Sequence, residues 1–156
     1  ITQPEGICID DALAGSTDKV ALTLHPDASL LSSNEVESSA VKANDSDSRS
    51  YTFYSNLLRS NCPVTNQPDW GTLAVSITSD KAFDEASMLR YILSFRQHNG
   101  FHEQCVEQIF ADLSKHYEPS ELMVRAWYTR RGGIDINPRR VSDIKLLPQP
   151  SRLIRQ

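Results

Sequence analysis

The stretch Thr72-Leu73-Ala74-Val75-Ser76-Ile77-Thr78 alternates apolar and polar side chains, with Leu73, Val75 and Ile77 on one side. This period of two is typical of an antiparallel strand that buries one face. Residues 84–98 then switch to a helical period, because their apolar side chains recur on one stripe. The switch predicts an α+β fold. The stripe consists of Met88, Leu89, Ile92, Leu93 and Phe95.

The flanking sequence completes a pattern of strands and helices. Residues 51–58 read as a strand before this stretch, and residues 102–117 read as a second helix after the Asn99-Gly100 stop signal. A strand follows at 122–129, and Gly132-Gly133 predicts a tight turn into a return strand at 134–137. The order is ββααββ, which predicts a four-stranded antiparallel sheet with two helices on one face.

Composition sets the class of protein. The 156 residues include 16 Lys and Arg against 20 Asp and Glu, for a formal charge of −4, and 39 % are hydrophobic. A packed core is therefore expected. There is no apolar run of the ~18 residues that a membrane span needs, and no basic block that would favour nucleic acid. Three widely spaced cysteines make neither a disulfide framework nor a CxxC metal site. We therefore expect a cytoplasmic, metal-free protein.

Residues 1–50 differ in texture from residues 51–156. The first segment is rich in Ser, Asp and Ala, and residues 31–50 have no aromatic side chain, so they offer little apolar surface to offset ordering entropy. We interpret 1–50 as a partly flexible inter-module segment with a short strand at 20–24, and 51–156 as the folded module. The first residue is Ile1, which suggests either a processed piece or one module of a longer protein.

The loop Ser60-Asn61-Cys62-Pro63-Val64-Thr65-Asn66-Gln67-Pro68-Asp69-Trp70 carries the first candidate chemistry. A thiol becomes a good nucleophile when its pKa falls or a base lies nearby. Asp69 follows Cys62 by seven positions, a spacing that allows the loop to fold the carboxylate back to the sulfur. The alternative is a buried structural cysteine and a turn aspartate.

Two further groups have functional and ordinary interpretations. In Phe101-His102-Glu103, the glutamate complements the start of a helix, or it binds adjacent N–H donors such as a guanine edge. Phe101 would then stack on the base and His102 would move a proton. In Thr129-Arg130-Arg131-Gly132-Gly133, the arginines suit a phosphate, or they are simply solvated charges on a turn.

Together these blocks resemble one family. The loop around Cys62, the words Ser94-Phe95-Arg96-Gln97-His98-Asn99 and Phe101-His102-Glu103-Gln104-Cys105-Val106-Glu107, and residues 128–138 resemble the NADPH-dependent 7-cyano-7-deazaguanine reductases of queuosine biosynthesis, a tRNA-modification pathway. The resemblance implies a tunnelling fold. It also implies reduction of a nitrile to an aminomethyl group with two NADPH per turnover.

The resemblance also implies roles for residues. Cys62 is the nucleophile that forms a covalent thioimide, and Asp69 is its acid–base partner. His102 and Glu103 hold the substrate, with the glutamate on the guanine-like edge and His102 also in a catalytic role. Phe101 stacks on the ring. The two residues that match the NADPH-contacting part of the family are Arg131 and Gly132.

One family motif, beginning Glu-Ser-Lys-Ser, does not follow Asp69 here; residues 76–80 read Ser-Ile-Thr-Ser-Asp. The resemblance therefore implies the C-terminal module of a two-module enzyme. Its expected partners are an N-terminal module, a small 7-deazaguanine substrate and a second copy in a homodimer, without direct nucleic-acid or membrane binding. Two alternatives stay open: a zinc-dependent pterin or purine cyclohydrolase-like enzyme, and a non-catalytic purine-binding module.

Overall fold

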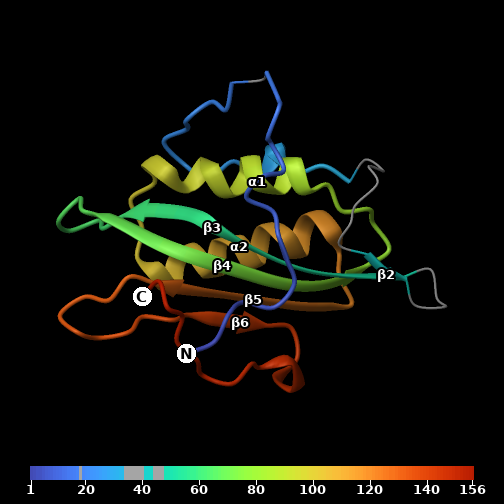
Figure 1. Cartoon of the computed structure of the whole chain (residues 1–156). Coiled ribbons are helices and arrows are strands. Elements are labelled where there is room, and N and C mark those ends of the chain that lie inside the picture. Colours follow the sequence, from blue (N-terminus) through green and yellow to red (C-terminus); the bar gives the residue numbers. More distant parts are fainter. Residues whose placement is uncertain (18, 34–40, 44–47) are drawn as a thin grey trace.

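The structure, a computed structural model, describes residues 1–17, 19–33, 41–43 and 48–156. Helices and strands follow one another in the chain as Figure 1 shows. The strands are β1 Ile7–Cys8, β2 Val41–Ala43, β3 Arg49–Asn61, β4 Pro68–Ser79, β5 Glu121–Tyr128 and β6 Arg139–Val141. The helices are α1 Glu85–Leu93 and α2 His102–Tyr117, with 3-10 turns η1 Ala28–Leu30, η2 Ser94–Gln97 and η3 Ile144–Leu146.

Within the described residues the sheet has six strands, five of them in the order β1-β3-β4-β5-β6, and β2 also pairs with β3. Strands β3 to β6 and the two helices follow the predicted ββααββ order. These four strands pair antiparallel with their neighbours in the sheet. The predicted count of four strands is wrong, however, because β1 joins β3 in parallel and β2 joins it antiparallel. These two strands have only two and three residues, which is too short for a periodic signal.

The turn after β5 has the predicted glycine geometry, but the return strand starts later than predicted. Gly132 and Gly133 both have positive φ, 56° and 80°, as a two-residue hairpin turn requires. Residues 134–137 are not a strand, although the Ile136 carbonyl accepts from Tyr128 N at 3.3 Å. Pro138 has no N–H to donate, so the ladder becomes regular only from β6 onward.

Local side-chain and backbone chemistry sets where the helices begin and end. Asp84 caps α1, because its side chain accepts hydrogen bonds from Ala86 N at 3.0 Å and Ser87 N at 3.3 Å. The helix predicted over residues 84–98 is α-helical only to Leu93 and continues as the tighter η2. Helix α2 has the predicted bounds and ends at Tyr117, because its C-cap Glu118 has a left-handed φ of 46°.

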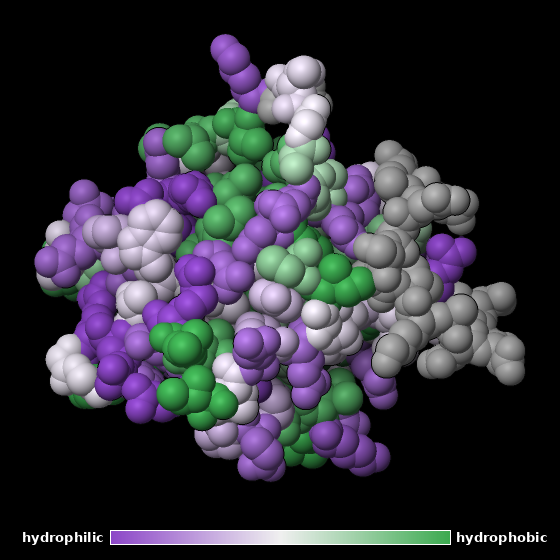
Figure 2. All heavy atoms as spheres, viewed as in Figure 1, coloured by the Kyte–Doolittle hydropathy of each residue, from purple (hydrophilic) through white to green (hydrophobic). Residues whose placement is uncertain are grey.

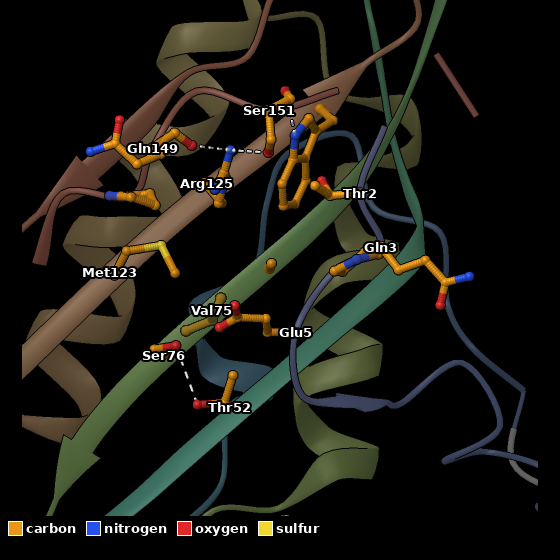
Figure 3. A pocket seen from close by; sticks show the side chains of 14 residues that line it. Thr2, Gln3, Glu5, Thr52, Val75, Ser76, Met123, Arg125, Gln149 and Ser151 are labelled. Carbon is orange, nitrogen blue, oxygen red and sulfur yellow. Dashed lines mark hydrogen bonds between the residues drawn. The ribbon is translucent and has the colours of Figure 1, made fainter. Parts of the chain in front are cut away.

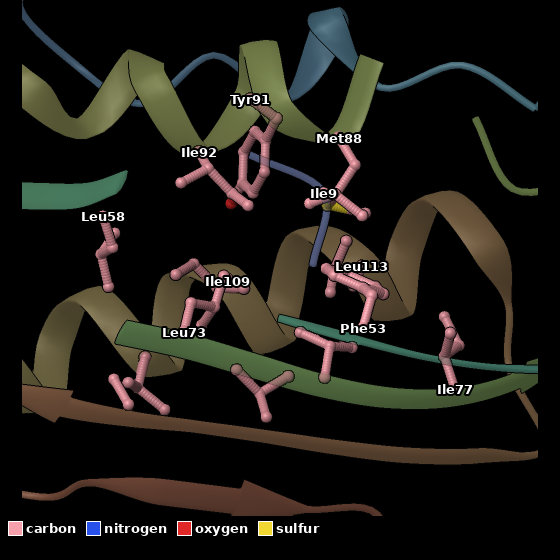
Figure 4. Packing of buried hydrophobic residues seen from close by; sticks show 14 of the residues in the cluster. Ile9, Phe53, Leu58, Leu73, Ile77, Met88, Tyr91, Ile92, Ile109 and Leu113 are labelled. Carbon is pink, nitrogen blue, oxygen red and sulfur yellow. The ribbon is translucent and has the colours of Figure 1, made fainter. Parts of the chain in front are cut away.

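The hydrophobic core lies between the helices and the sheet. Figure 4 shows Met88 and Ile92 of α1 pointing toward Ile109 and Leu113 of α2, with Leu73 of β4 on the sheet side. All five side chains are fully buried. Because both helices pack on the core, they stabilise the strands that carry the candidate site.

The N-terminal segment contributes to this core. Ile9 is 1 % exposed and Leu31 is 6 % exposed, and both belong to the main hydrophobic cluster. Asp10 accepts hydrogen bonds from Ser55 Oγ at 2.6 Å and from Asn56 N at 3.0 Å. Residues 20–24 form no strand, contrary to the prediction. The Ser-rich stretch predicted as flexible falls largely on 34–40 and 44–47, outside the described residues.

The surface mixes polar and apolar residues. Figure 2 shows them interspersed over the face turned to the viewer. None of the helices within the described ranges is long and apolar enough to span a bilayer. On the sheet face that the helices leave free, Ala74, Trp127 and Leu153 form a second, small apolar cluster with Tyr54.

Candidate active site

Cys62 lies in the tight loop that joins β3 to β4. Its N–H donates to the Gln67 carbonyl and its carbonyl accepts from Asn66 N, both at 2.8 Å. Asn66 adopts a left-handed φ of 56°, which lets the loop close on itself. The Cys62 side chain is 4 % exposed. The two prolines and the internal hydrogen bonds therefore fix the thiol in a defined, mostly buried position.

Asp69 is the second residue of β4, on the opposite side of this loop, and it pairs with Ser60 of β3. Its carboxyl group is 5 % exposed and contacts two basic side chains. Arg131 Nε donates to Oδ1 at 3.1 Å and Arg131 Nη2 forms an ion pair with the same oxygen. His102 Nε2 lies 3.0 Å from Oδ2. A buried carboxylate with such partners is compensated rather than stranded.

Arg131 links the two candidate reacting groups. Its Nη1 donates to Cys62 Sγ at 3.3 Å while Nε and Nη2 engage Asp69. Cys62 and Asp69 thus share one guanidinium as a contact partner. The sequence leaves a phosphate contact and a solvated turn open for Arg131, and it gives no indication that this residue contacts the sulfur.

The surroundings of Cys62 favour a thiolate. The pKa of this thiol is lowered to about 6, first by a hydrogen bond from the Thr65 side chain and next by the one from Arg131. Backbone N–H groups of Thr65 and Val64 add to the effect, and burial opposes it. At pH 7 a pKa near 6 gives about nine-tenths thiolate, against roughly 3 % for an ordinary cysteine with a pKa of about 8.5.

A second thiol beneath the site is tuned in the opposite direction. Burial raises the pKa of Cys105, which faces the core as predicted and neighbours Ser60 and Tyr128. Tyr128 is fully buried, its pKa is raised by burial, and its ring stacks on His102 with centroids 4.1 Å apart. The stack fixes the plane of the imidazole that faces Asp69.

The other predicted site residues are exposed, next in sequence to His102 or Arg131. Phe101 precedes α2 and is 49 % exposed, and its N–H donates to Gln104 Oε1 at 3.2 Å. Glu103 is exposed in the first turn of α2, directly after His102. Gly132 lies at the tip of the hairpin, where a Cβ atom would meet no other atom within 4 Å. Contacts therefore join Cys62 and Asp69 to Arg131 and His102, while Phe101, Glu103 and Gly132 offer exposed surfaces beside them.

Two contributors are not apparent from the sequence. Thr65 belongs to a polar loop without standing out in it, although its position three residues after a cysteine is a spacing at which a turn can return a hydroxyl to the sulfur. Tyr128 is one more residue of an alternating strand, and nothing in its sequence neighbourhood indicates a stack on His102. Within the described ranges, no group of three His, Cys, Asp or Glu side chains is arranged to hold a metal ion.

A separate cavity of about 430 Å³ lies on the helix-free face of the sheet. Figure 3 shows Met123 and Arg125 of β5 on one side of it and the N-terminal residues Thr2, Gln3 and Glu5 on the other. The Arg125 guanidinium lies 3.9 Å from the Trp127 ring centroid and donates to Ser151 Oγ at 3.0 Å. This cavity shares no lining residue with the group around Cys62.

Fold and site together define an α+β protein in which a buried thiol and a buried carboxylate are joined by a partly exposed guanidinium from a neighbouring hairpin. A family model described as "QueF-like protein" matches residues 68–145, half of the chain. The chain therefore belongs to the QueF-like family.

Relatives at high identity agree with this assignment. The "NADPH-dependent 7-cyano-7-deazaguanine reductase" of Psychrobacter cryohalolentis is 79 % identical over all 156 residues, which cover 53 % of its length. The protein of the same name from Acinetobacter baylyi is 54 % identical over 156 residues, which cover 52 % of its length. The chain thus spans about half the length of the curated relatives it matches.

One solved structure supports the fold. The crystal structure of the archaeosine synthase QueF-Like in the apo form matches with a TM-score of 0.54 and 14 % identity, covering 64 % of this chain and 96 % of that one. At this identity the likeness concerns the fold alone.

Proposed function

We propose that this chain is the catalytic module of a cytoplasmic oxidoreductase that reduces 7-cyano-7-deazaguanine to 7-aminomethyl-7-deazaguanine with NADPH, a step of queuosine biosynthesis. The observation that carries the proposal is the contact of one guanidinium with both Cys62 Sγ and Asp69 Oδ1. The names of the relatives above support the choice of reaction.

The chemistry of the first step suits this arrangement. A nitrile resists direct hydride attack, whereas addition of the Cys62 thiolate to its carbon makes a C–S bond and converts C≡N to C=N. The developing negative charge on nitrogen takes up one proton as it forms. Asp69 receives this proton from His102, whose Nε2 lies 3.0 Å from Oδ2, and passes it to the nitrogen. The product of this step is a covalent thioimide on Cys62. Burial of both side chains keeps water from competing.

The substrate is held at the start of α2 in this proposal. Glu103 accepts two hydrogen bonds from the guanine-like edge, because its exposed carboxylate offers two oxygens to adjacent N–H donors. Phe101 stacks on the ring with its exposed face. His102 lies between these exposed residues and Asp69, so it can contact the substrate and pass a proton to the carboxylate.

The residues of the hairpin fit the cosubstrate. Two NADPH molecules would each supply one hydride per nitrile. Arg131 offers a guanidinium whose side chain is 37 % exposed, and Gly132 offers backbone that no neighbouring atom covers. An anion can approach such a turn closely. Arg131 and Gly132 are therefore the residues proposed to hold it.

The assembly completes the proposal. The chain covers 53 % and 52 % of the two relatives above, which supports a two-module enzyme with an N-terminal partner module and residues 1–50 joining the halves. We propose that the module has a tunnelling fold, because its strands and helices follow the ββααββ order of that fold. The strands at both sheet edges have two or three residues each. Pairing of such edges between copies would give the proposed homodimer.

The test is a covalent adduct. Incubation of the purified protein with 7-cyano-7-deazaguanine, without NADPH, should add the mass of one substrate, and peptide mapping should place it on Cys62. The Cys62→Ala variant should show no adduct, whereas Cys8→Ala, at an exposed thiol, should behave like the wild type. An adduct on another residue, or reduction activity that survives in Cys62→Ala, would refute the mechanism. Tight binding without any adduct would favour a non-catalytic purine-binding module, and stoichiometric zinc with hydrolysis would favour a cyclohydrolase.

A further inference from the structure

Arg131 contacts both reacting side chains of the mechanism above. The dinucleotide role assigned to it does not explain why its guanidinium lies 3.3 Å from Cys62 Sγ and 3.1 Å from Asp69 Oδ1. We propose that Arg131 is also an activating residue, whose guanidinium stabilises Cys62 as a thiolate and fixes the Asp69 carboxylate beside it. This inference rests on the nucleophilic role proposed for Cys62.

The hairpin aims Arg131 at the site. Arg131 N donates to the Ile134 carbonyl at 3.2 Å and Ile134 N donates back at 3.0 Å, which closes the two-residue turn. The strand that ends in this turn, β5, pairs with β4 from Gly71 onward, so the turn lies beside Asp69. The position of the guanidinium therefore follows from the strand register and the glycine turn.

The charged and polar groups around the sulfur come from four elements. The loop of Cys62 itself supplies the Thr65 hydroxyl and two backbone N–H groups. From β4 comes Asp69, whose negative charge would oppose a thiolate if it were unpaired. From α2 comes His102, which faces Asp69 Oδ2. In the part of the chain that the structure describes, Arg131 is the cation with a contact to the sulfur, and it also neutralises the carboxylate.

The planar fork of arginine matters for this role. Separate N–H donors reach the sulfur and the carboxylate at the same time, so one residue sets both the charge of Cys62 and its distance from Asp69. A lysine at the same position keeps the charge but offers a single compact ammonium, which cannot hold both partners in the same geometry. Arg131→Lys should therefore retain part of the effect.

A purely structural role would look different. If Arg131 only pinned the hairpin, its loss would lower stability without changing the protonation equilibrium of Cys62. If it only held the dinucleotide, its loss would weaken NADPH binding and leave the free thiol unchanged. The pH profile of Cys62 reactivity without nitrile or NADPH separates activation from both alternatives.

The experiment follows iodoacetamide alkylation of Cys62 against pH by peptide mass spectrometry, which resolves this cysteine from Cys8 and Cys105. The wild-type midpoint is expected near 6. Arg131→Gln should raise the midpoint by about one pH unit, a tenfold change in the thiol–thiolate equilibrium, because the Thr65 contact remains. Arg131→Lys should fall between. The matched control is Arg130→Gln, whose guanidinium faces Asp135 at 3.7 Å and should leave the midpoint unchanged.

Two results would overturn the inference: Gln and Lys variants with the same Cys62 midpoint as Arg130→Gln, or a midpoint that rises equally for the exposed Cys8. Thermal unfolding of each variant confirms that a folded protein is compared, and the Lys variant decides if the Gln variant does not fold. The nitrile adduct is measured separately. A raised midpoint in Arg131→Gln with no wild-type adduct would refute the proposed function and leave the thiolate role standing.

Discussion

Replacement of Asp69 by Asn tests the proposed proton donor with little change in shape. The carboxyl group is buried, so bulk water is a poor substitute for the lost acid. A positioned general acid contributes roughly 10²–10⁴ in rate, and this burial leads us to expect about 10³ slower adduct formation on Cys62. Quenched single-turnover reactions with 7-cyano-7-deazaguanine, read by intact mass, measure this rate directly.

The same change should cost only moderate stability. Breaking a fully buried ion pair costs about 3–5 kcal/mol. The Arg131 side chain is 37 % exposed, however, and can turn to water, so we expect about 1–2 kcal/mol in a urea titration. Asp135→Asn is the control, because that carboxylate pairs with Arg152 at 2.9 Å outside the site. Adduct formation by Asp69→Asn within about threefold of wild type would refute the acid role.

Three further substitutions test how the fold supports the site. Ile9→Ala should lower the free energy of unfolding by about 2–4 kcal/mol, since Ile9 is 1 % exposed in the core. The control Ile144→Ala, at an exposed side chain, should change it by less than about 0.5 kcal/mol. Equal effects would show that the N-terminal segment does not pack on the module. Asp84→Ala should cost about 1 kcal/mol through loss of the α1 cap, and a neutral result in urea denaturation would contradict the capping geometry. Gly71→Ala places a methyl group 3.1 Å from the Tyr128 ring, so it should cost about 1–3 kcal/mol and slow adduct formation by displacing the ring from His102; an unchanged rate would separate the stack from the chemistry.

Periodic segments are predictable because their burial is one-sided. Helix α2 has a regular apolar face, a start after Asn99-Gly100 and a stop at Glu118-Pro119, and its bounds match the prediction. Helix α1 is shorter than predicted, because the apolar stripe continues through Phe95 while the α-helix does not. The backbone tightens to a 3-10 turn from Ser94, whose hydroxyl donates to the Tyr91 carbonyl at 2.6 Å. The spacing of apolar residues indicates which face is buried. An α-helix and a 3-10 helix bury the same face over a single turn, so this spacing does not distinguish them.

The short strands are beyond the reach of periodicity. Strand β1 has two residues and is defined by its partner, since Ile7 and Cys8 pair in parallel with Phe53 and Tyr54. The return strand begins later than predicted. The alternation of Ile134 and Ile136 is typical of a strand, but Pro138 has no backbone N–H to donate to the ladder. In both cases the deciding information lies in a neighbouring strand or a missing N–H, and hydropathy carries neither.

The candidate site shows the same division between local and long-range information. Cys62 and Asp69 flank one hairpin, so their proximity follows from a loop of known length, and this part is predictable. Arg131 is 69 positions from Cys62, and its contact depends on the β4–β5 register together with a turn that directs the side chain inward. The sequence therefore leaves open whether an arginine beside two glycines binds an anion or is solvated, and the fold decides between them. In the described structure the partners of the guanidinium are the sulfur and the carboxylate of the protein itself. The proposed thiolate of Cys62 therefore depends on the folded hairpin pair rather than on the cysteine loop alone.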